Sequence, residues 1–263
     1  MYQSLLFVPG DRPERFDRAV ASGAGAAVID LEDAVQPDDK AAARANIAAW
    51  LQQGGKAVAR INAIGTPWHG DDLGLLANPG IIAVMLPMVE DANALRAFIA
   101  TLPRSLPVIA LIETARGLWD LGELVAVRGL TRLGFGSIDF QLDTGIEDEG
   151  EGLLYARSRV VLASAMAGLE PPLDGVSVDL DDMSGLERDT ARARGLGFGG
   201  KLCIHPAQVE VVNRGFAASD EELDWARRVV DAAKGAKGAI RLDGKLIDAP
   251  VVSRARRLLE AGV

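Results

Sequence analysis

The sequence predicts a (β/α)8 TIM barrel with a short C-terminal helical extension, and three observations lead to this prediction. The chain has 263 residues, of which 49% are hydrophobic, so it is long enough to bury one large core. Short apolar runs alternate with longer segments of helical spacing, which is the order of a protein built from βα units. The apolar runs are nearly continuous, as in parallel strands that are covered on both faces.

Eight apolar runs have the length and composition of strands. They are Leu5–Val8, Ala27–Leu31, Ala57–Ile61, Ile82–Leu86, Val108–Ile112, Arg132–Phe135, Gly175–Val178 and Lys201–Ile204. Helical spacing between them is found over Arg12–Ala21, Asp39–Leu51, Asp91–Ala100, Leu153–Ala167 and Leu186–Arg194. The rival architecture, an open doubly wound sheet, usually has a glycine-rich phosphate turn after its first strand, where this chain reads PGDRPERF. The pattern therefore favours the closed barrel.

The chain continues for about one sixth of its length after the predicted eighth strand and its helix. We expect residues 1–216 to form the barrel and residues 217–263 to form the extension. The extension is predicted to contain a helix over Ser219–Lys234, a loop or hairpin with the sequence IRLDGKLIDAP, and a last helix that ends near Leu259. Since the barrel is complete without it, we interpret the extension as a lid or an oligomer contact.

Charge and composition exclude several classes of partner. The formal net charge is -9 and the sequence pI is about 4.9, so nucleic acid is not an expected ligand. No apolar run is long enough to predict a membrane span, and the start of the chain lacks the basic leader of a secretory signal. A single cysteine, Cys203, excludes an internal disulfide. We therefore expect a cytoplasmic protein.

Polar side chains follow most of the predicted strands, at the end of a barrel where reactive groups lie. They are Asp30, Glu32 and Asp33 after the second strand, Arg60 and Asn62 after the third, Glu113 after the fifth, Ser137 and Asp139 after the sixth, Asp179 after the seventh, and Lys201 and His205 at the eighth. Any one of them could be a satisfied structural group. Together they predict a site in which several carboxylates face a few cations.

Glu113 and Asp139 are the predicted ligands of a divalent metal ion. They follow neighbouring strands, and like charges that are brought close need a cation to neutralise them. Oxygen ligands favour Mg²⁺, with Mn²⁺ as the alternative, and Mg²⁺ usually takes only one or two protein carboxylates. We expect Glu32 and Asp33 to hold water molecules on the ion. Cysteine and histidine residues are too few and too scattered for a four-ligand zinc site.

Arg60 is open to two interpretations. Its planar guanidinium suits a substrate carboxylate, and together with a metal ion it would stabilise an enolate during carbon-carbon cleavage. The alternative is a structural salt bridge across the barrel mouth to Glu32 or Asp30.

Several long segments carry a resemblance to a known family. They are LLFVPGDRPERF, VIDLEDAVQPDDKAAAR, ARIN followed by GTPW, LIETARGL, LGFGSIDFQLD, LLYARSRVVLASAMAGL and GFGGKLCIHPAQV. Together they resemble the citrate lyase beta subunit-like group of the HpcH/HpaI aldolase family over nearly the whole chain. The resemblance implies a (β/α)8 barrel in a homotrimer or homohexamer. It also implies Mg²⁺-dependent chemistry on 3-hydroxy-acyl thioesters of the citryl, malyl or citramalyl type, with coenzyme A as part of the substrate.

The resemblance also implies roles for individual residues. By position, Glu113 and Asp139 are similar to the family's metal ligands, with Glu113 also close to the substrate, and Arg60 is similar to the arginine that contacts the oxo-acid. Gly10 and Arg12 occupy the segment in which relatives approach the substrate or its coenzyme A portion.

The extension and the fourth strand supply two further expectations. Asp248, in the segment GKLIDAP, matches an acid-base aspartate of the family's lid, which a neighbouring subunit often supplies. Relatives often read MLPK after the fourth strand, where this chain reads MLPM, so Met88 replaces a common lysine. This difference is either neutral variation at the rim or a change in the handling of an anionic substrate.

The sequence therefore predicts a Mg²⁺-dependent carbon-carbon lyase that cleaves or forms a 3-hydroxy-acyl thioester through an enolate. Two alternatives stay open. One is an aldolase that acts on free 2-oxo acids, and the other is a beta subunit that works only with a partner acyl carrier protein. The residues do not identify the acyl group, since shape selection depends on loop packing.

Overall fold

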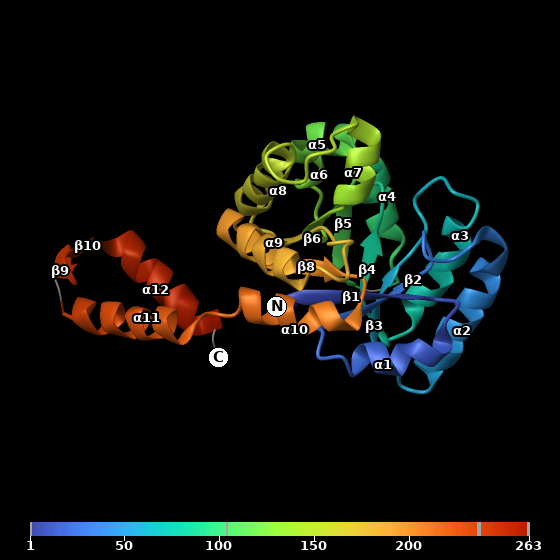
Figure 1. The fold of residues 1–263 in the computed structure, drawn as a ribbon. Helices are drawn as coiled ribbons and strands as arrows, with labels where there is room; N and C mark the ends of the chain where they lie inside the picture. Colours follow the sequence, from blue (N-terminus) through green and yellow to red (C-terminus); the bar gives the residue numbers. More distant parts are fainter. Residues whose placement is uncertain (1, 104, 236–237, 262–263) are drawn as a thin grey trace. The chain divides into compact units, whose positions relative to one another are not determined.

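The computed structural model describes residues 2–103, 105–235 and 238–261. The chain divides into two compact units, with the division between Phe216 and Ala217. Figure 1 shows a ring of helices around a central set of strands in the first unit, and helices with a small hairpin in the second.

The first unit is a closed barrel of eight parallel strands. They are β1 (Ser4–Pro9), β2 (Ala26–Asp30), β3 (Ala57–Arg60), β4 (Ile81–Leu86), β5 (Val108–Ile112), β6 (Leu130–Phe135), β7 (Glu170–Asp174) and β8 (Gly200–Cys203). Each strand pairs with the next along the chain, and β8 pairs with β1. The predicted TIM barrel with a helical extension is confirmed, and seven predicted strands match observed ones to within two residues at each end.

Helices and short 3-10 turns follow the strands. They are η1 (Pro13–Arg15), α1 (Phe16–Val20), η2 (Pro37–Asp39), α2 (Lys40–Gln52), α3 (His69–Asp72), η3 (Leu73–Ala77), α4 (Ala92–Thr101), α5 (Ala115–Trp119), α6 (Leu121–Leu124), α7 (Ser137–Thr144), α8 (Leu154–Ala167), α9 (Met183–Leu196) and α10 (Pro206–Phe216). The segment predicted as one helix over Arg12–Ala21 is a 3-10 turn followed by α1, because Pro13 and Pro9 bracket a tight turn closed by the bond from the Arg12 N–H to the Pro9 carbonyl.

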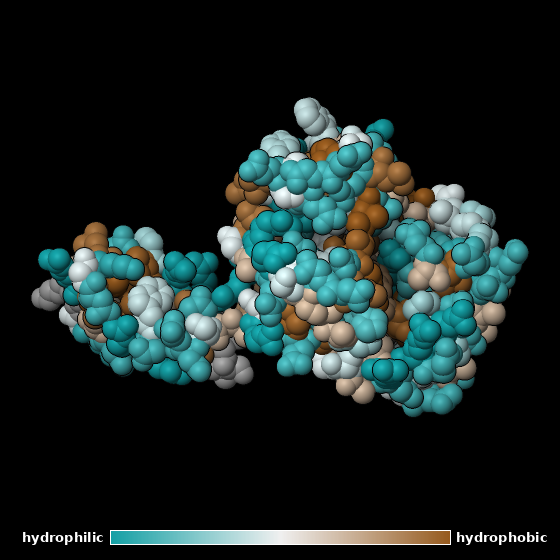
Figure 2. Space-filling view, in the orientation of Figure 1, coloured by the Kyte–Doolittle hydropathy of each residue, from teal (hydrophilic) through white to brown (hydrophobic). Residues whose placement is uncertain are grey.

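Successive side chains of a strand point to opposite faces, so the barrel has two hydrophobic clusters, one on each face of its strands. The inner cluster fills the barrel and includes Leu5, Val28, Met85 and Leu111. The outer cluster lies between strands and helices, and Leu6, the neighbour of Leu5, belongs to it. In Figure 2 hydrophobic residues lie between largely hydrophilic helix surfaces of this unit. Both faces of the strands are therefore covered, as their continuous apolar runs predict.

The predicted seventh strand is wrong. The strand is Glu170–Asp174, and Gly175–Val178 lies after it. The strand contains Pro171 and Pro172, which are unusual in a strand because proline lacks the N–H that a strand interior normally donates. In β7 their carbonyls act as acceptors instead: the Pro172 oxygen accepts from the Gly199 N–H at 2.9 Å. The acid at the strand end is consequently Asp174 and not Asp179.

The second unit is a helical pair with a hairpin. It consists of α11 (Asp220–Ala233), β9 (Ile240–Leu242), β10 (Lys245–Ile247) and α12 (Ala249–Ala261). Its small core contains Ala226, Val229, Ile247 and Ala255. A capping box begins α11, since Ser219 and Glu222 exchange side-chain and backbone hydrogen bonds. In the described part of the chain, every helix is too short or too polar to cross a membrane.

Candidate active site

A cavity of about 360 Å³ opens at the carboxyl ends of the barrel strands, and four of the predicted site residues line it. Arg60, Glu113, Asp139 and Asp33 all line it. The apolar part of its wall consists of Phe7, Ala34, Leu111, Phe135, Ile138, Val176, Leu202 and Ile204. A charged cluster beside an apolar wall is the usual composition of a small-molecule site.

Arg60 is held by carboxylates on one side of this cavity. Its Nε and one terminal nitrogen donate to the two oxygens of Asp30 at 2.7 and 2.6 Å, and Asp30 is completely buried. The other terminal nitrogen lies 2.8 Å from Glu32, and the guanidinium stacks 4.7 Å from the centre of the Phe7 ring. The structure thus contains the salt bridge to Asp30 and Glu32 that was one interpretation of Arg60. A bidentate pair orients the guanidinium, and its edge still lines the cavity.

Glu113 is a buried carboxyl in the turn between β5 and α5, with only 3% of its surface exposed. One oxygen accepts the Met88 N–H at 2.7 Å, and its other oxygen lies against Gly136, where any Cβ would overlap the glutamate. Burial raises the pKa of Glu113 from 4.5 to about 7, although the Met88 hydrogen bond acts to lower it. A cation bound beside Glu113 would therefore stabilise its ionised form and lower its pKa.

Two other acids in the cluster have raised pKa values for the same reason. Burial raises the pKa of Glu32 from 4.5 to about 8, with Arg60 opposing and the charge of Asp33 adding to the shift. Asp139 is half-buried in the first turn of α7, and burial and then the charge of Asp33 raise its pKa. For each of these acids burial is the largest cause of the raised pKa, and the charges of neighbouring acids add to it.

The donor set fits a divalent, oxygen-preferring metal ion. Glu113 and Asp139 line one cavity and present carboxylates with raised pKa values, which a bound cation would return to the ionised state. Within the described ranges no group of three His, Cys, Asp or Glu residues has the geometry of a metal site. Two carboxylates completed by water and substrate oxygens are typical of Mg²⁺.

The metal-free protein is expected to lose stability as the pH rises from about 5 to about 8. The folded-state pKa values of Glu113 and Glu32 are about 7 and about 8, each raised from 4.5. Their stabilisation is complete below the unfolded value and is lost as the pH passes the folded values. Melting temperatures measured across this range in a chelator should fall for the wild type and fall less for Glu113→Gln. Glu123→Gln, at an exposed position, is the control, and an unchanged slope in Glu113→Gln would contradict the expectation.

Gly10 and Arg12 are not among the residues that line the cavity, and Asp248 belongs to the second unit. Gly10 is buried at the end of β1, where its N–H donates to the Asp30 carbonyl at 2.8 Å and a Cβ would come within 2.7 Å of that oxygen. This close approach is a structural reason for glycine. Arg12 is exposed, with Asp11 3.8 Å from its Nε. Asp248 lies in the second unit between β10 and α12, where its carboxylate accepts the Val251 N–H at 3.2 Å.

Lys40 also supports the site, although it is not among the residues predicted from the sequence. It is 4% exposed and donates to the carbonyls of Leu31 and Glu32 at 2.7 and 2.9 Å, with the Trp68 ring centre 4.8 Å away. Burial lowers its pKa, while the charge of Asp30 opposes this effect. Lys40 thereby fixes the loop that presents Glu32 to Arg60. A lysine that begins the helix directly after an acidic loop is the signal in the sequence.

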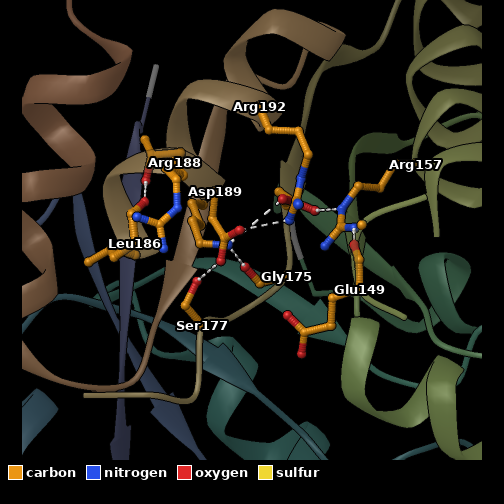
Figure 3. Close-up of polar contacts among 12 residues, drawn as sticks. Glu149, Arg157, Gly175, Ser177, Leu186, Arg188, Asp189 and Arg192 are labelled. Atoms are coloured by element: carbon orange, nitrogen blue, oxygen red, sulfur yellow. Dashed lines mark hydrogen bonds and ion pairs between the residues drawn. The ribbon is translucent and has the colours of Figure 1, made fainter. Parts of the chain in front are cut away.

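A second buried network, part of which is drawn in Figure 3, holds the segment that follows β7. Arg157 donates to Asp174 at 2.9 Å and to the Glu149 carbonyl, and Lys201 donates to the Gly175 carbonyl at 2.6 Å with Asp174 3.7 Å away. Lys201, expected at the mouth, is therefore an internal charge. The network holds the segment that begins at Gly175 and leads to the cavity residue Val176.

The segment after β7 is also held by a hydrogen bond to α9. Ser177 donates to Asp189 at 2.8 Å, and Asp189 also pairs with Arg192 at 2.8 Å, as Figure 3 shows. Asp179 is exposed, and its carboxylate accepts the N–H groups of Asp181 and Asp182. It shapes a turn and is not among the residues that line the cavity.

Comparisons with known proteins agree with this architecture. Residues 3–206 match the HpcH/HpaI aldolase/citrate lyase family, and residues 162–261 match a C-C bond lyase of the TIM-barrel fold. A citrate lyase subunit beta-like protein of Mycobacterium tuberculosis is 36% identical, over 97% of this chain and 93% of its own. A (3S)-malyl-CoA thioesterase of Cereibacter sphaeroides is 32% identical, over 98% and 93%.

Solved structures extend the comparison. CitE from Mycobacterium tuberculosis, in complex with magnesium, acetoacetate and coenzyme A, superposes with a TM-score of 0.86 at 35% identity, covering 99% of this chain and 97% of its own. Magnesium and coenzyme A, which the sequence predicted as cofactor and as part of the substrate, are thus both found in that relative. The family match, the whole-chain identity and the shared barrel agree on one assignment. This chain belongs to the HpcH/HpaI aldolase/citrate lyase family of carbon-carbon lyases.

Proposed function

We propose that this protein is a Mg²⁺-dependent lyase that cleaves or forms a 3-hydroxy-acyl thioester of coenzyme A. The observation that carries the proposal is the pair Glu113 and Asp139, two carboxyls with raised pKa values on the wall of one cavity that Arg60 also lines. In this proposal they hold the metal ion, and Glu32 and Asp33 bind its water molecules. A bound Mg²⁺ would supply positive charge for the oxygen of the developing enolate.

In this proposal, residues of the chain bind the substrate carboxylate and transfer the protons. Arg60 binds the substrate carboxylate through the edge of its guanidinium that lines the cavity, while Asp30 and Glu32 keep it oriented. A carboxylate on the cavity wall accepts the proton of the 3-hydroxyl group. The adjacent carbon-carbon bond breaks, its electrons pass to the thioester as an enolate, and an oxo-acid is released. A proton donor then converts the enolate carbon to the acyl thioester.

Asp248 is proposed as that proton donor, with the second unit as a lid. The carboxylate lies at the start of α12, next to the hairpin. We propose a homo-oligomer, a trimer or hexamer, in which a neighbouring copy supplies this unit. Gly10 and Arg12 belong to the same proposal as the approach to the coenzyme A portion, supported by the exposure of the arginine beyond β1. We also propose a cytoplasmic location, supported by a single, buried cysteine.

A substrate screen tests the proposed reaction. Citryl-, malyl- and citramalyl-coenzyme A should be incubated with the protein, with Mg²⁺ or with a chelator, and the released oxaloacetate, glyoxylate or pyruvate measured. We expect one thioester to yield its oxo-acid and acetyl-coenzyme A only with Mg²⁺. Release of free coenzyme A without an oxo-acid would indicate hydrolysis instead.

A second reading is favoured by one relative, the citrate lyase subunit beta of Leuconostoc mesenteroides, which is 33% identical over 98% of this chain. In that case the acyl group would be carried by an acyl carrier protein. Turnover of an acylated carrier but of no coenzyme A ester would identify this role. Reaction of pyruvate with an aldehyde, without activity on any thioester, would overturn the proposal in favour of a free 2-oxo acid aldolase.

A further inference from the structure

The loop between β4 and α4 contains a backbone conformation that residues with a side chain rarely adopt. Met88 has a φ of 52°, in the left-handed region. In the described part of the chain, the other non-glycine residue with positive φ is Asp243, in the tight turn of the hairpin. Met88 does not lie in a hairpin turn, and the residue is 44% exposed, so packing of the side chain does not account for the conformation.

Three contacts on the residues after Met88 hold this loop against the end of β5. The Val89 N–H donates to the Leu111 carbonyl at 3.3 Å, and the Thr114 hydroxyl donates to Glu90 at 2.6 Å. Gly117 completes the contact, because a Cβ there would lie 2.6 Å from the Val89 carbonyl oxygen. The loop is thus pinned to the segment that carries Glu113, and the backbone at Met88 has to turn between two fixed ends.

The result of this turn is a hydrogen bond to a site residue. The Met88 N–H points at one carboxylate oxygen of Glu113, at 2.7 Å, and the other oxygen lies against Gly136 on the cavity wall. We propose that Met88 is a positioning residue: its left-handed backbone fixes the rotation of the Glu113 carboxylate, so that one oxygen is presented to the metal ion. The Met88 side chain takes no part in this role. The inference rests on the proposed function, in which Glu113 is a metal ligand.

Three substitutions at residue 88 separate the backbone from the side chain. Met88→Gly keeps the N–H and adopts positive φ without strain, so wild-type Mg²⁺ affinity is expected. Met88→Leu keeps a similar size and the same backbone preference, and it should also match the wild type. Met88→Val places a β-branched residue in the left-handed region, which turns the N–H away, and the Mg²⁺ dissociation constant should rise by about tenfold. Mg²⁺ binding is measured by titration calorimetry on each folded variant, next to its melting temperature in a chelator.

A merely structural role would lower the melting temperature of Met88→Val and leave the Mg²⁺ affinity of the folded protein unchanged. That result would overturn the inference. Equal weakening in the valine and glycine variants would overturn it too, because the side chain and not the backbone would then be responsible.

The pinning contacts provide a test that does not depend on the folding of the valine variant. Glu90→Ala removes the acceptor of the Thr114 hydroxyl, and the Mg²⁺ dissociation constant should rise by roughly threefold. Glu90→Gln retains an amide oxygen as acceptor and is the matched control, expected to bind Mg²⁺ as the wild type does. Wild-type affinity in both variants would contradict the proposal.

Glu113→Ala distinguishes this failure from a failure of the proposed function. If Glu113→Ala binds Mg²⁺ as tightly as the wild type, Glu113 is not a ligand and both proposals fall. If Glu113→Ala loses Mg²⁺ affinity while Met88→Val and Glu90→Ala retain it, the metal site stands and only the positioning role of Met88 is wrong.

Discussion

Replacing Glu113 by alanine is expected to lower kcat/KM for the thioester by about 1,000-fold or more, because a metal ligand and part of the stabilisation of the enolate disappear together. Asp139→Ala should have an effect of the same kind. The measurement is turnover as a function of Mg²⁺ concentration, combined with calorimetric Mg²⁺ binding. Saturating Mg²⁺ should not restore the alanine variants, since the lost carboxylate also orients the ion.

Glu113→Gln gives this prediction a second signature. Glutamine keeps the size of the side chain and an oxygen for the Met88 N–H, but it carries no charge. Since burial opposes ionisation of Glu113, the glutamine variant should be more stable than the wild type at pH 8 without metal, although it is inactive. An active Glu113→Gln variant, or wild-type Mg²⁺ affinity in either alanine variant, would refute the metal assignment.

Replacing Arg60 by methionine is expected to reduce both stability and activity. Asp30 is completely buried and receives two hydrogen bonds from Arg60, so removing the guanidinium leaves a buried charge without its partner. The expected loss in the free energy of unfolding is about 3–5 kcal/mol. Arg60→Lys should also lose activity, since an ammonium group cannot reproduce the planar pairing. Urea denaturation and kcat/KM are the two measurements.

The double variant Asp30→Asn/Arg60→Met separates the two effects. Because the double variant removes the charges of Asp30 and Arg60 together, it should recover much of the lost stability, while activity stays absent because the substrate carboxylate has lost its partner. Recovery of both stability and activity would show that Arg60 is only a structural partner of Asp30. Unimpaired activity in Arg60→Lys would argue against bidentate recognition.

The sequence was sufficient for the fold and for the region of the site. Apolar runs alternating with helices specify parallel strands, and the carboxyl ends of such strands meet at one mouth. The pattern therefore predicts that Arg60, Glu113 and Asp139 lie close together although they are distant along the chain. In the structure all three line one cavity. The seventh strand was missed because its prolines contradict the usual composition of a strand, although they lie where the ladder needs acceptors.

The order of residues is thus enough to predict which kinds of side chain meet at the barrel mouth: an excess of carboxylates around an arginine. How each of them is used depends on the contacts in the folded chain. It pairs Asp30 with Arg60, holds the Glu32 loop on Lys40, and leaves Glu113 buried with a backbone N–H as its partner. These choices depend on burial and on distances of a few ångströms, which residue order does not encode. They are also what separates a carboxylate that serves the fold from one that is ready for a metal ion.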